Sequence, residues 1–241
     1  MNKGSSSAVP WVRLAVEVAA IVGSILIAFA IDAWWQERQE DKAEREILVS
    51  LQDEFTFHRA TLARDKEFWA GNEASVSRLM QLFRSGEIPG PMVMDTLFLG
   101  LTWMHTWDPG SGASDALIAS GSLELIENIG LRNNLSKWQS RVDEVRDNEL
   151  VAREMNLKTI MPYLAERGFS FSRASRIVGE DWPAPVASDA EAARVNRVLL
   201  SDPVFEGYVA MRYIWFDQAE YSNAMALADS ILVAIEAELG R

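Results

Sequence analysis

The chain contains no cysteine and only two histidines among its 241 residues. Without cysteine it forms no disulfide, offers no thiolate nucleophile and supplies no sulfur ligand to a structural zinc ion. Two histidines argue against a histidine-rich metal centre, so we predict neither a metal nor a cofactor. Cysteine-free proteins occur in both reducing and oxidising compartments, so this absence does not decide where the protein resides.

Positive charge is scarce, with 23 Lys and Arg against 35 Asp and Glu and a net charge of −12. Nucleic-acid phosphates require a basic surface, so a nucleic-acid partner is not expected. Chemical motifs are also missing. The Gly110–Gly112 loop lacks the Lys-Ser/Thr of a phosphate loop, and no G-x-S-x-G nucleophile motif occurs. We therefore predict no catalytic residue and a non-enzymatic protein.

One long apolar run is present, VAAIVGSILIAFAI from Val18 to Ile31. Extended from Leu14 to Trp35 it would reach about 33 Å as a helix, enough to cross the hydrocarbon core of a bilayer. Tryptophans at its edges, and an arginine four residues before a glutamate, are typical of membrane interfaces. We predict a transmembrane helix over residues 13–35, in contact with the lipid bilayer. The predicted interface residues are Trp11, Arg13, Glu17, Trp34 and Trp35.

Two other interpretations of this run stay open. Ala28-Phe29-Ala30 has the A-x-A form of a signal-peptidase site, and a buried helix of a soluble domain is the third alternative. Against cleavage, Glu17 interrupts the start of the run and a helical pattern continues beyond it without a break. Against a buried soluble helix stand the flanking tryptophans and the abrupt change to dense charge. We favour the uncleaved anchor.

Basic residues indicate the orientation of the span. Lys3 and Arg13 flank its N-terminal side, while the other flank mixes Arg38, Lys42 and Arg45 with acidic residues. The count of Lys and Arg alone is ambiguous, so we rely on a first and single span behind a short basic tail. We expect residues 1–12 in the cytoplasm and residues 36–241 as a periplasmic domain of a bacterial inner-membrane, single-pass protein.

One face of the span carries small residues at intervals of four, with Gly23 beside them. Such faces allow two helix backbones to approach closely, although small residues are common in any span. Helix–helix contact in the membrane is therefore a hypothesis for Ala20, Ser24 and Ala28.

After the span, apolar residues recur every seven positions, which predicts one long helix from Gln36 to Phe83, continuous with the span. It should end in the Gly- and Pro-rich stretch Ser85–Pro91. The apolar row is Leu48, Phe55, Leu62, Trp69, Val76 and Phe83, and the interleaved row is Leu51, His58, Asp65, Asn72 and Leu79. In the second row, the polar residues His58, Asp65 and Asn72 could set register, hold water or bind a ligand, and we favour the structural role.

Further helices are predicted in the rest of the chain. Their expected ranges are Met92–Trp107, Ser114–Gly121 with Ser114 as cap, Leu131–Arg167 with a kink at Pro162, Ser188–Leu200 with Glu191 in a capping box, and one helix from Asp202 to Gly240. Phe169–Pro185 should be irregular. The class is therefore all-α: a transmembrane helix continuing into a long stalk and an elongated antiparallel helical bundle.

Tryptophans, a histidine and a serine suggest a second candidate site. An aromatic cleft is a hypothesis for Trp103, His105, Trp107, Ser114 and Trp138. His105 could also form a triad with Asp108 and Asp115, but a histidine packed between tryptophans is favoured because nothing fixes a catalytic geometry. Glu149 falls on the apolar stripe of its predicted helix and would face the polar row of the first.

Two segments resemble a widespread family of uncharacterised bacterial single-span membrane proteins. The first has Glu17, Gly23, Ile25 to Ala28, Asp32, Trp34 or Trp35, Glu37, Arg38, Leu51 and Glu54 at the matching positions, and the second is DALIASGSLELIENIGLRNNLSKW, Asp115 to Trp138. The resemblance implies an inner-membrane anchor with an α-helical outer domain and supplies no activity or catalytic residue. At His58, many relatives would have Asn.

These observations favour a membrane-anchored interaction or scaffold protein. Its partner would be a second copy, as a homo-oligomer, or another envelope protein. A ligand-sensing outer domain that signals through a partner is the first alternative, and a hydrolase around His105 and Ser114 is the second.

Overall fold

A computed structural model describes residues 11–110, 112–170, 173, 177, 188–214 and 218–240. Within these residues the regular structure is helical and no strand occurs, which confirms the all-α class. The helices are α1 (Trp11–Ser85), α2 (Pro91–Thr102), α3 (Ala113–Ala119), the 3-10 helix η1 (Ser122–Leu125), α4 (Ile129–Met155), the π-helix η2 (Asn156–Ile160), α5 (Met161–Glu166), α7 (Asp189–Leu200), α8 (Pro203–Ile214) and α9 (Ala219–Leu239).

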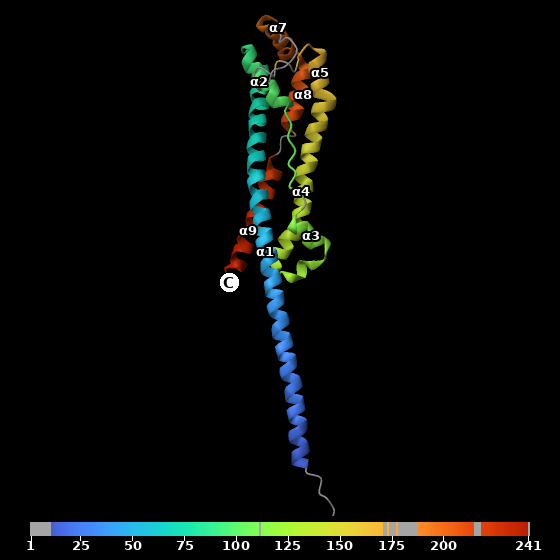
Figure 1. The fold of residues 1–241 in the computed structure, drawn as a ribbon. Helices are drawn as coiled ribbons and strands as arrows, with labels where there is room; N and C mark the ends of the chain where they lie inside the picture. The colour runs from blue at the N-terminus through green and yellow to red at the C-terminus, as the bar shows by residue number, and fades with distance from the viewer. Residues whose placement is uncertain are drawn as a thin grey trace, which may run out of the picture.

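Helix α1 is continuous over 75 residues, so it is about 110 Å long at 1.5 Å per residue. Its first half projects alone from the molecule, and its second half forms one side of the bundle (Figure 1). The predicted continuity of span and stalk is confirmed. The helix ends at Gly86, whose φ of +69° is the left-handed conformation that glycine adopts easily.

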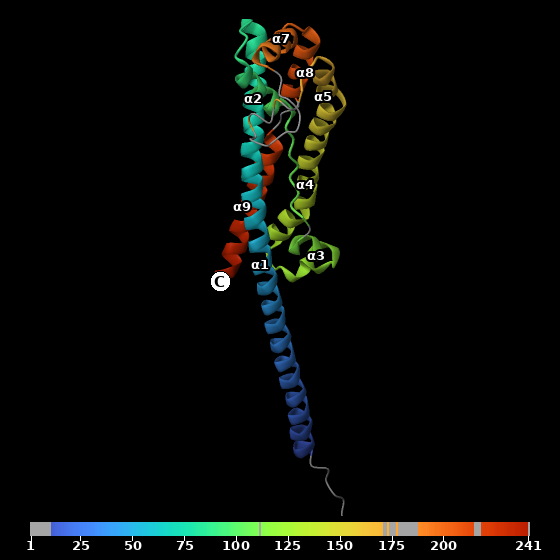
Figure 2. The same ribbon diagram turned by 45° about the horizontal axis from the view of Figure 1, so that its top comes forward.

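The bundle is made by α1, α4 and α9, with α2, α5, α7 and α8 at the end far from the projecting helix (Figures 1 and 2). Helices α1 and α4 both run away from the projecting end, and α9 runs back in contact with both of them. Contacts of Arg45 with Leu239 and of Arg59 with Asp229 show that α9 is antiparallel to α1. The chain thus returns to the level of Arg45, where the bundle begins.

Helix α2 ends at Thr102, five residues before the predicted end at Trp107. Trp103 is extended, with φ −69° and ψ 138°, and residues 103–110 are non-helical. We call residues 103–110 the connecting segment, because they run back between α1 and α4 (Figure 1). The prediction of helix here was wrong because it used apolar content alone, whereas side chains of α1 and α4 bind the extended backbone, as described below.

Ser114 does not cap the helix that follows. The N-cap of α3 is Gly112, and Ser114 lies in the first turn with its side chain bound to Glu54 of α1. The predicted stop is correct, since Gly121 has φ +72° and ends the turn after α3.

The helix predicted over Leu131–Arg167 is present but interrupted. A π-helical turn, η2, lies directly before Pro162, which has no N–H and whose ring needs room in the preceding turn. The helix starts two residues early because Asn128 accepts a hydrogen bond from the Leu131 amide. It ends before Gly168, which has φ +81°.

The last helix is divided into α8 and α9, where one was predicted. Buried Phe205, Val209 and Arg212 of α8 would, on a continued helix, be followed by buried positions 219 and 223. Those positions are exposed, and α9 buries Tyr221 and Ala224 instead. The buried face of α9 is therefore shifted by about one residue position from where a continuation of α8 would place it. The caps at Ser188 and Asp202 are confirmed, and most of the irregular Phe169–Pro185 lies outside the described residues.

Two apolar cores lie one after the other along α1. The core nearer the projecting helix joins α1, α4 and α9 and includes Leu51, Phe55, Leu62, Trp138, Val145, Ala228 and Ile231. The far core joins α1, α2, α5, α7 and α8 and includes Val76, Leu82, Phe98, Ile160, Leu199 and Phe205.

Candidate functional site

The polar row of α1 lies against the connecting segment. His58, Asp65 and Asn72 are each at most 5% exposed, on the same face as the apolar core residues. The Asn72 side-chain amide donates to the Trp103 carbonyl at 3.1 Å. A buried backbone carbonyl needs a hydrogen-bond partner, and Asn72 supplies it at the point where α2 has ended.

Asp65 is a buried carboxylate in the middle of the row, and two other side chains contact it. One of its oxygens accepts from Arg64 Nε at 3.0 Å, and the other lies 3.2 Å from His105 Nε2. The His105 side chain is 43% exposed, so it covers Asp65 from the outside. This contact joins the middle of the connecting segment to α1.

His58 is packed among aromatic rings. It stacks on Trp138 with ring centroids 5.3 Å apart and planes at 10°, and it meets the edges of Phe55 and Trp107. Burial lowers the pKa of His58, although the nearby Glu54 acts in the opposite direction. The imidazole is therefore held in its neutral form as part of the core.

Glu149 of α4 faces this row, as its position on the stripe predicts. Its carboxylate accepts from the Trp107 amide at 2.9 and 3.1 Å and from the Tyr221 hydroxyl of α9. Burial raises the pKa of Glu149, and these hydrogen bonds oppose the shift. The pKa of Tyr221 is raised as well, first by its own burial and then by Glu149. One buried carboxylate thus joins α4, α9 and the connecting segment.

Glu54 of α1 likewise binds the backbone of another segment, at the start of α3. It accepts from the Ser114 amide at 2.9 Å and from the Ser114 hydroxyl at 2.5 Å. A Cβ on Gly112 would stand 2.4 Å from the Glu54 carboxyl carbon, so a larger residue here would require the Glu54 side chain to move. The Glu54 carboxylate of α1 thus accepts hydrogen bonds from donors in the first turn of α3 that lack partners within that helix.

Three of these partners were not predicted, namely Glu54, Thr61 and Asn156. Thr61 accepts from the Trp107 indole N–H at 3.0 Å, and Asn156 donates to the Leu101 and Thr102 carbonyls at 3.3 and 3.4 Å. The sequence gives only a weak indication of these three residues, because each is a single polar residue beside an apolar stripe. The role of each depends on where the connecting segment or α3 lies in the fold.

A second buried polar cluster lies in the far core and was also not predicted. Arg173 is fully buried, pairs with Asp95 of α2 and donates to the Asn196 amide oxygen at 3.0 Å. Its guanidinium also lies 5.1 Å from the ring centroid of Phe169. The cluster joins α2 and α7 to the chain that follows α5.

The cleft predicted around the tryptophans is not formed. Trp107, Ser114 and Trp138 are at most 4% exposed, so their side chains belong to the core, while Trp103 and His105 remain partly exposed. His105 faces Asp65 whereas Ser114 faces Glu54. These two partners are eleven residues apart on α1, about 16 Å along its axis. The geometry therefore does not bring His105 and Ser114 together.

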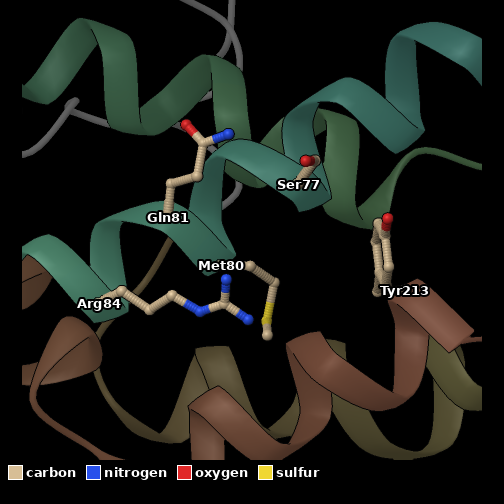
Figure 3. A pocket seen from close by; sticks show the side chains of 5 residues that line it. All are labelled: Ser77, Met80, Gln81, Arg84 and Tyr213. Atoms are coloured by element: carbon tan, nitrogen blue, oxygen red, sulfur yellow. The ribbon is translucent and has the colours of Figure 1, made fainter.

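Two hollows lie on the bundle surface among the residues that the structure describes. One of about 200 Å³ lies between α1 and α8 and is lined by Ser77, Met80, Gln81, Arg84 and Tyr213 (Figure 3). Another of about 550 Å³ lies between α1 and the α3–η1 region. Neither contains a residue of the polar row. Within the described ranges, no group of three or more His, Asp or Glu side chains is arranged to hold a metal ion.

The first half of α1 differs from the bundle because its apolar residues are not packed against other helices. Its apolar window has mean hydropathy 2.5 and is 0% buried. In the part of the chain that the structure describes, it is the helix long and apolar enough to cross a membrane. Trp11, Trp34 and Trp35 are exposed at its two ends, and Arg13 lies 3.4 Å from Glu17. Ala20, Ser24 and Ala28 follow one exposed face, and the Ser24 hydroxyl donates to the Ile21 carbonyl at 2.8 Å.

Comparisons with protein-family models, curated proteins and solved structures find no match for this chain. The resemblance to single-span bacterial membrane proteins therefore stays a prediction carried by its motif residues.

Proposed function

We propose that the protein is a non-enzymatic interaction or scaffold protein of the bacterial envelope, anchored by the first half of α1. The observation that carries the proposal is one helix with two surfaces: apolar on every side and unburied over residues 18–31, then apolar on a single stripe within a bundle. A helix of the first kind is stable when lipid surrounds it. The second kind builds a water-soluble domain that is held away from the lipid.

The polar side chains support a structural rather than a chemical role. Asn72, Glu149 and Glu54 bind backbone groups of the connecting segment and α3. None of them lines one of the hollows described above. A binding or scaffold domain needs a rigid frame of this kind, whereas an enzyme needs convergent groups in a cavity.

In this proposal residues 1–12 are cytoplasmic, and the bundle stands in the periplasm on the exposed helix from Gln36 to Glu44. A single-cysteine series tests this topology cleanly, because the chain has no cysteine of its own. Ser136→Cys on an exposed part of α4 should react with a membrane-impermeant maleimide in intact spheroplasts, and Ser5→Cys only after lysis. Labelling in the reverse order would overturn the orientation.

The proposed partner is a second copy or another envelope protein. Ala20, Ser24 and Ala28 would allow two spans to approach closely. Ser24→Cys should form a disulfide-linked dimer in oxidised membranes, whereas Val22→Cys, on the opposite side of the helix, should not. If neither variant crosslinks, the span is not the contact surface.

The deciding measurement is the native mass of the chain extracted in mild detergent. The proposal expects the full 27.0 kDa chain in an oligomer or with a co-purifying envelope protein. A monomer that is released without detergent, shortened after Ala30, would show that the first half of α1 is a removed signal.

A further inference from the structure

The helix just beyond the predicted span gathers its three basic residues on one side, where Asp41 and Glu46 flank them. Arg38, Lys42 and Arg45 follow the spacing i, i+4, i+7, which places them within about 60° of arc on one side. Glu37, Glu40 and Glu44 follow i, i+3, i+7 on another side, whose centre is about 130° away. We call the first set the basic stripe.

The two faces have different surroundings. Glu44 lies on the side of the bundle and accepts from the Glu127 amide at 2.7 Å. The basic stripe is exposed, and together with Trp35, Gln39 and Asp41 it lines a shallow hollow of about 560 Å³. The Arg38 guanidinium lies 5.5 Å from the ring centroid of Trp34. The stripe is therefore open to whatever adjoins the end of the span.

Because α1 is continuous, the distance of each side chain from the end of the predicted span follows from its position in the sequence. Arg38 and Lys42 follow Trp35 by about 4.5 and 10.5 Å along the axis, and a headgroup layer is about 5–8 Å thick. Side chains of a helix lean toward its N-terminus, which here is the membrane side. Long Arg and Lys side chains can thus bring their charges back into the headgroup layer. Arg45 lies further out and donates to the Leu239 carbonyl at the end of α9.

We propose that the basic stripe is a binding site for the phosphate of an anionic phospholipid headgroup, contacted by Arg38 and Lys42 beside Trp35. The inference rests on the proposed membrane anchor. A guanidinium and an ammonium are the groups that bind phosphate, and an indole at the same level occupies the interface. Asp41 and Glu46 flank the stripe, so the phosphate must compete for Lys42 with the Glu46 carboxylate, which lies 3.8 Å from Lys42 Nζ.

The test uses the full chain in nanodiscs that contain equal amounts of phosphatidylcholine and phosphatidylglycerol, released in mild detergent for native mass spectrometry. Wild type should retain phosphatidylglycerol in preference to phosphatidylcholine. Arg38→Gln with Lys42→Gln should lower that preference at least about fivefold, since each basic group near an anionic surface contributes about fivefold. The matched control, Lys137→Gln with Arg153→Gln, removes the same charge from exposed positions of α4 and should change nothing.

Each remaining outcome has its own meaning. A chain that enters the nanodisc but retains both lipids equally overturns the lipid site and leaves the anchor in place. Equal loss in the stripe variant and in the control would show an effect of net charge alone, which also overturns the site. A chain that never enters the nanodisc contradicts the proposed function itself.

Discussion

The two halves of α1 share one backbone but differ in how their side chains meet their surroundings. In the first half apolar residues occur on every side and none of the apolar window is buried. In the second half Leu51, Phe55 and Leu62 are completely buried, while Val49 and Phe57 on the other side are exposed. One continuous helix can therefore present two different surfaces, because only the distribution of side chains must change.

The largest expected effect comes from placing charge in the first half. Ile25→Asp with Phe29→Asp should prevent membrane insertion, because each central carboxylate costs about 2.5–3.5 kcal/mol. Val49→Asp with Phe57→Asp puts the same charges on exposed apolar positions of the same helix and should leave insertion unchanged. Extraction with alkaline carbonate measures both variants, and a firmly bound Ile25/Phe29 variant would contradict a lipid-embedded helix.

The reverse comparison concerns the core. Phe55→Ala should lower the free energy of unfolding of the bundle by about 3–5 kcal/mol, because it leaves a cavity against Trp138. Phe29→Ala in the first half should change it by less than about 0.5 kcal/mol. Urea unfolding in mild detergent, followed by circular dichroism, gives both values. Equal losses in the two variants would show that the halves unfold as one unit.

A smaller effect is expected for the polar row, which only the second half possesses. Asn72→Leu should destabilise the bundle by about 1–3 kcal/mol, since the Trp103 carbonyl would lose its donor inside the protein. Asn133→Leu, at an exposed position of α4, serves as the control and should stay within about 0.5 kcal/mol. The same urea titration measures them, and a neutral Asn72→Leu would mean that water replaces the amide.

The smallest expected effect is a change in pH dependence. Burial lowers the pKa of folded His58 below its ordinary 6.5, so unfolding takes up a proton once the pH falls below that value. Stability should therefore decrease on acidification below pH 6.5, by at most about 1.4 kcal/mol per pH unit. His58→Gln should flatten this slope in urea titrations over that range.

Glu149 is expected to change the stability with pH in the opposite direction to His58. Its pKa is raised by burial, so the stability linked to it is complete at low pH and is lost as the pH rises through the raised pKa. Glu149→Gln should therefore remove a loss of stability that begins as the pH rises above the ordinary pKa of about 4.5. An unchanged slope in His58→Gln would assign the acid sensitivity to another group.

Much of the fold follows from spacing alone. Heptad positions predict α1 up to Phe83, and Ser188, Asp202 and Gly168 mark helix ends where the structure has them. The extended backbone from Trp103 onward was missed, because MVMDTLFLGLTWMHTW is as apolar as a buried helix. Its conformation depends on Asn72, Asn156 and Glu149, which are distant in sequence.

The candidate sites divide in the same way. The row of His58, Asp65 and Asn72 could be recognised as a polar interruption of an apolar stripe, but its partners could not. Trp107 and Trp138 suggested an open cleft because composition does not distinguish a buried indole from an exposed one. The structure encloses both indoles around His58.

Local spacing was enough to predict that the chain is helical, that one run is apolar on all sides, and that the helix after it has a single buried face. These are local properties, since a helix repeats every 3.6 residues whatever surrounds it. Local spacing could not predict that residues 103–110 are extended, that α8 and α9 are separate helices, or that Glu54 and Glu149 bind backbone amides. Those features depend on hydrogen bonds and packing between distant segments, which buried backbone groups require and local spacing does not specify.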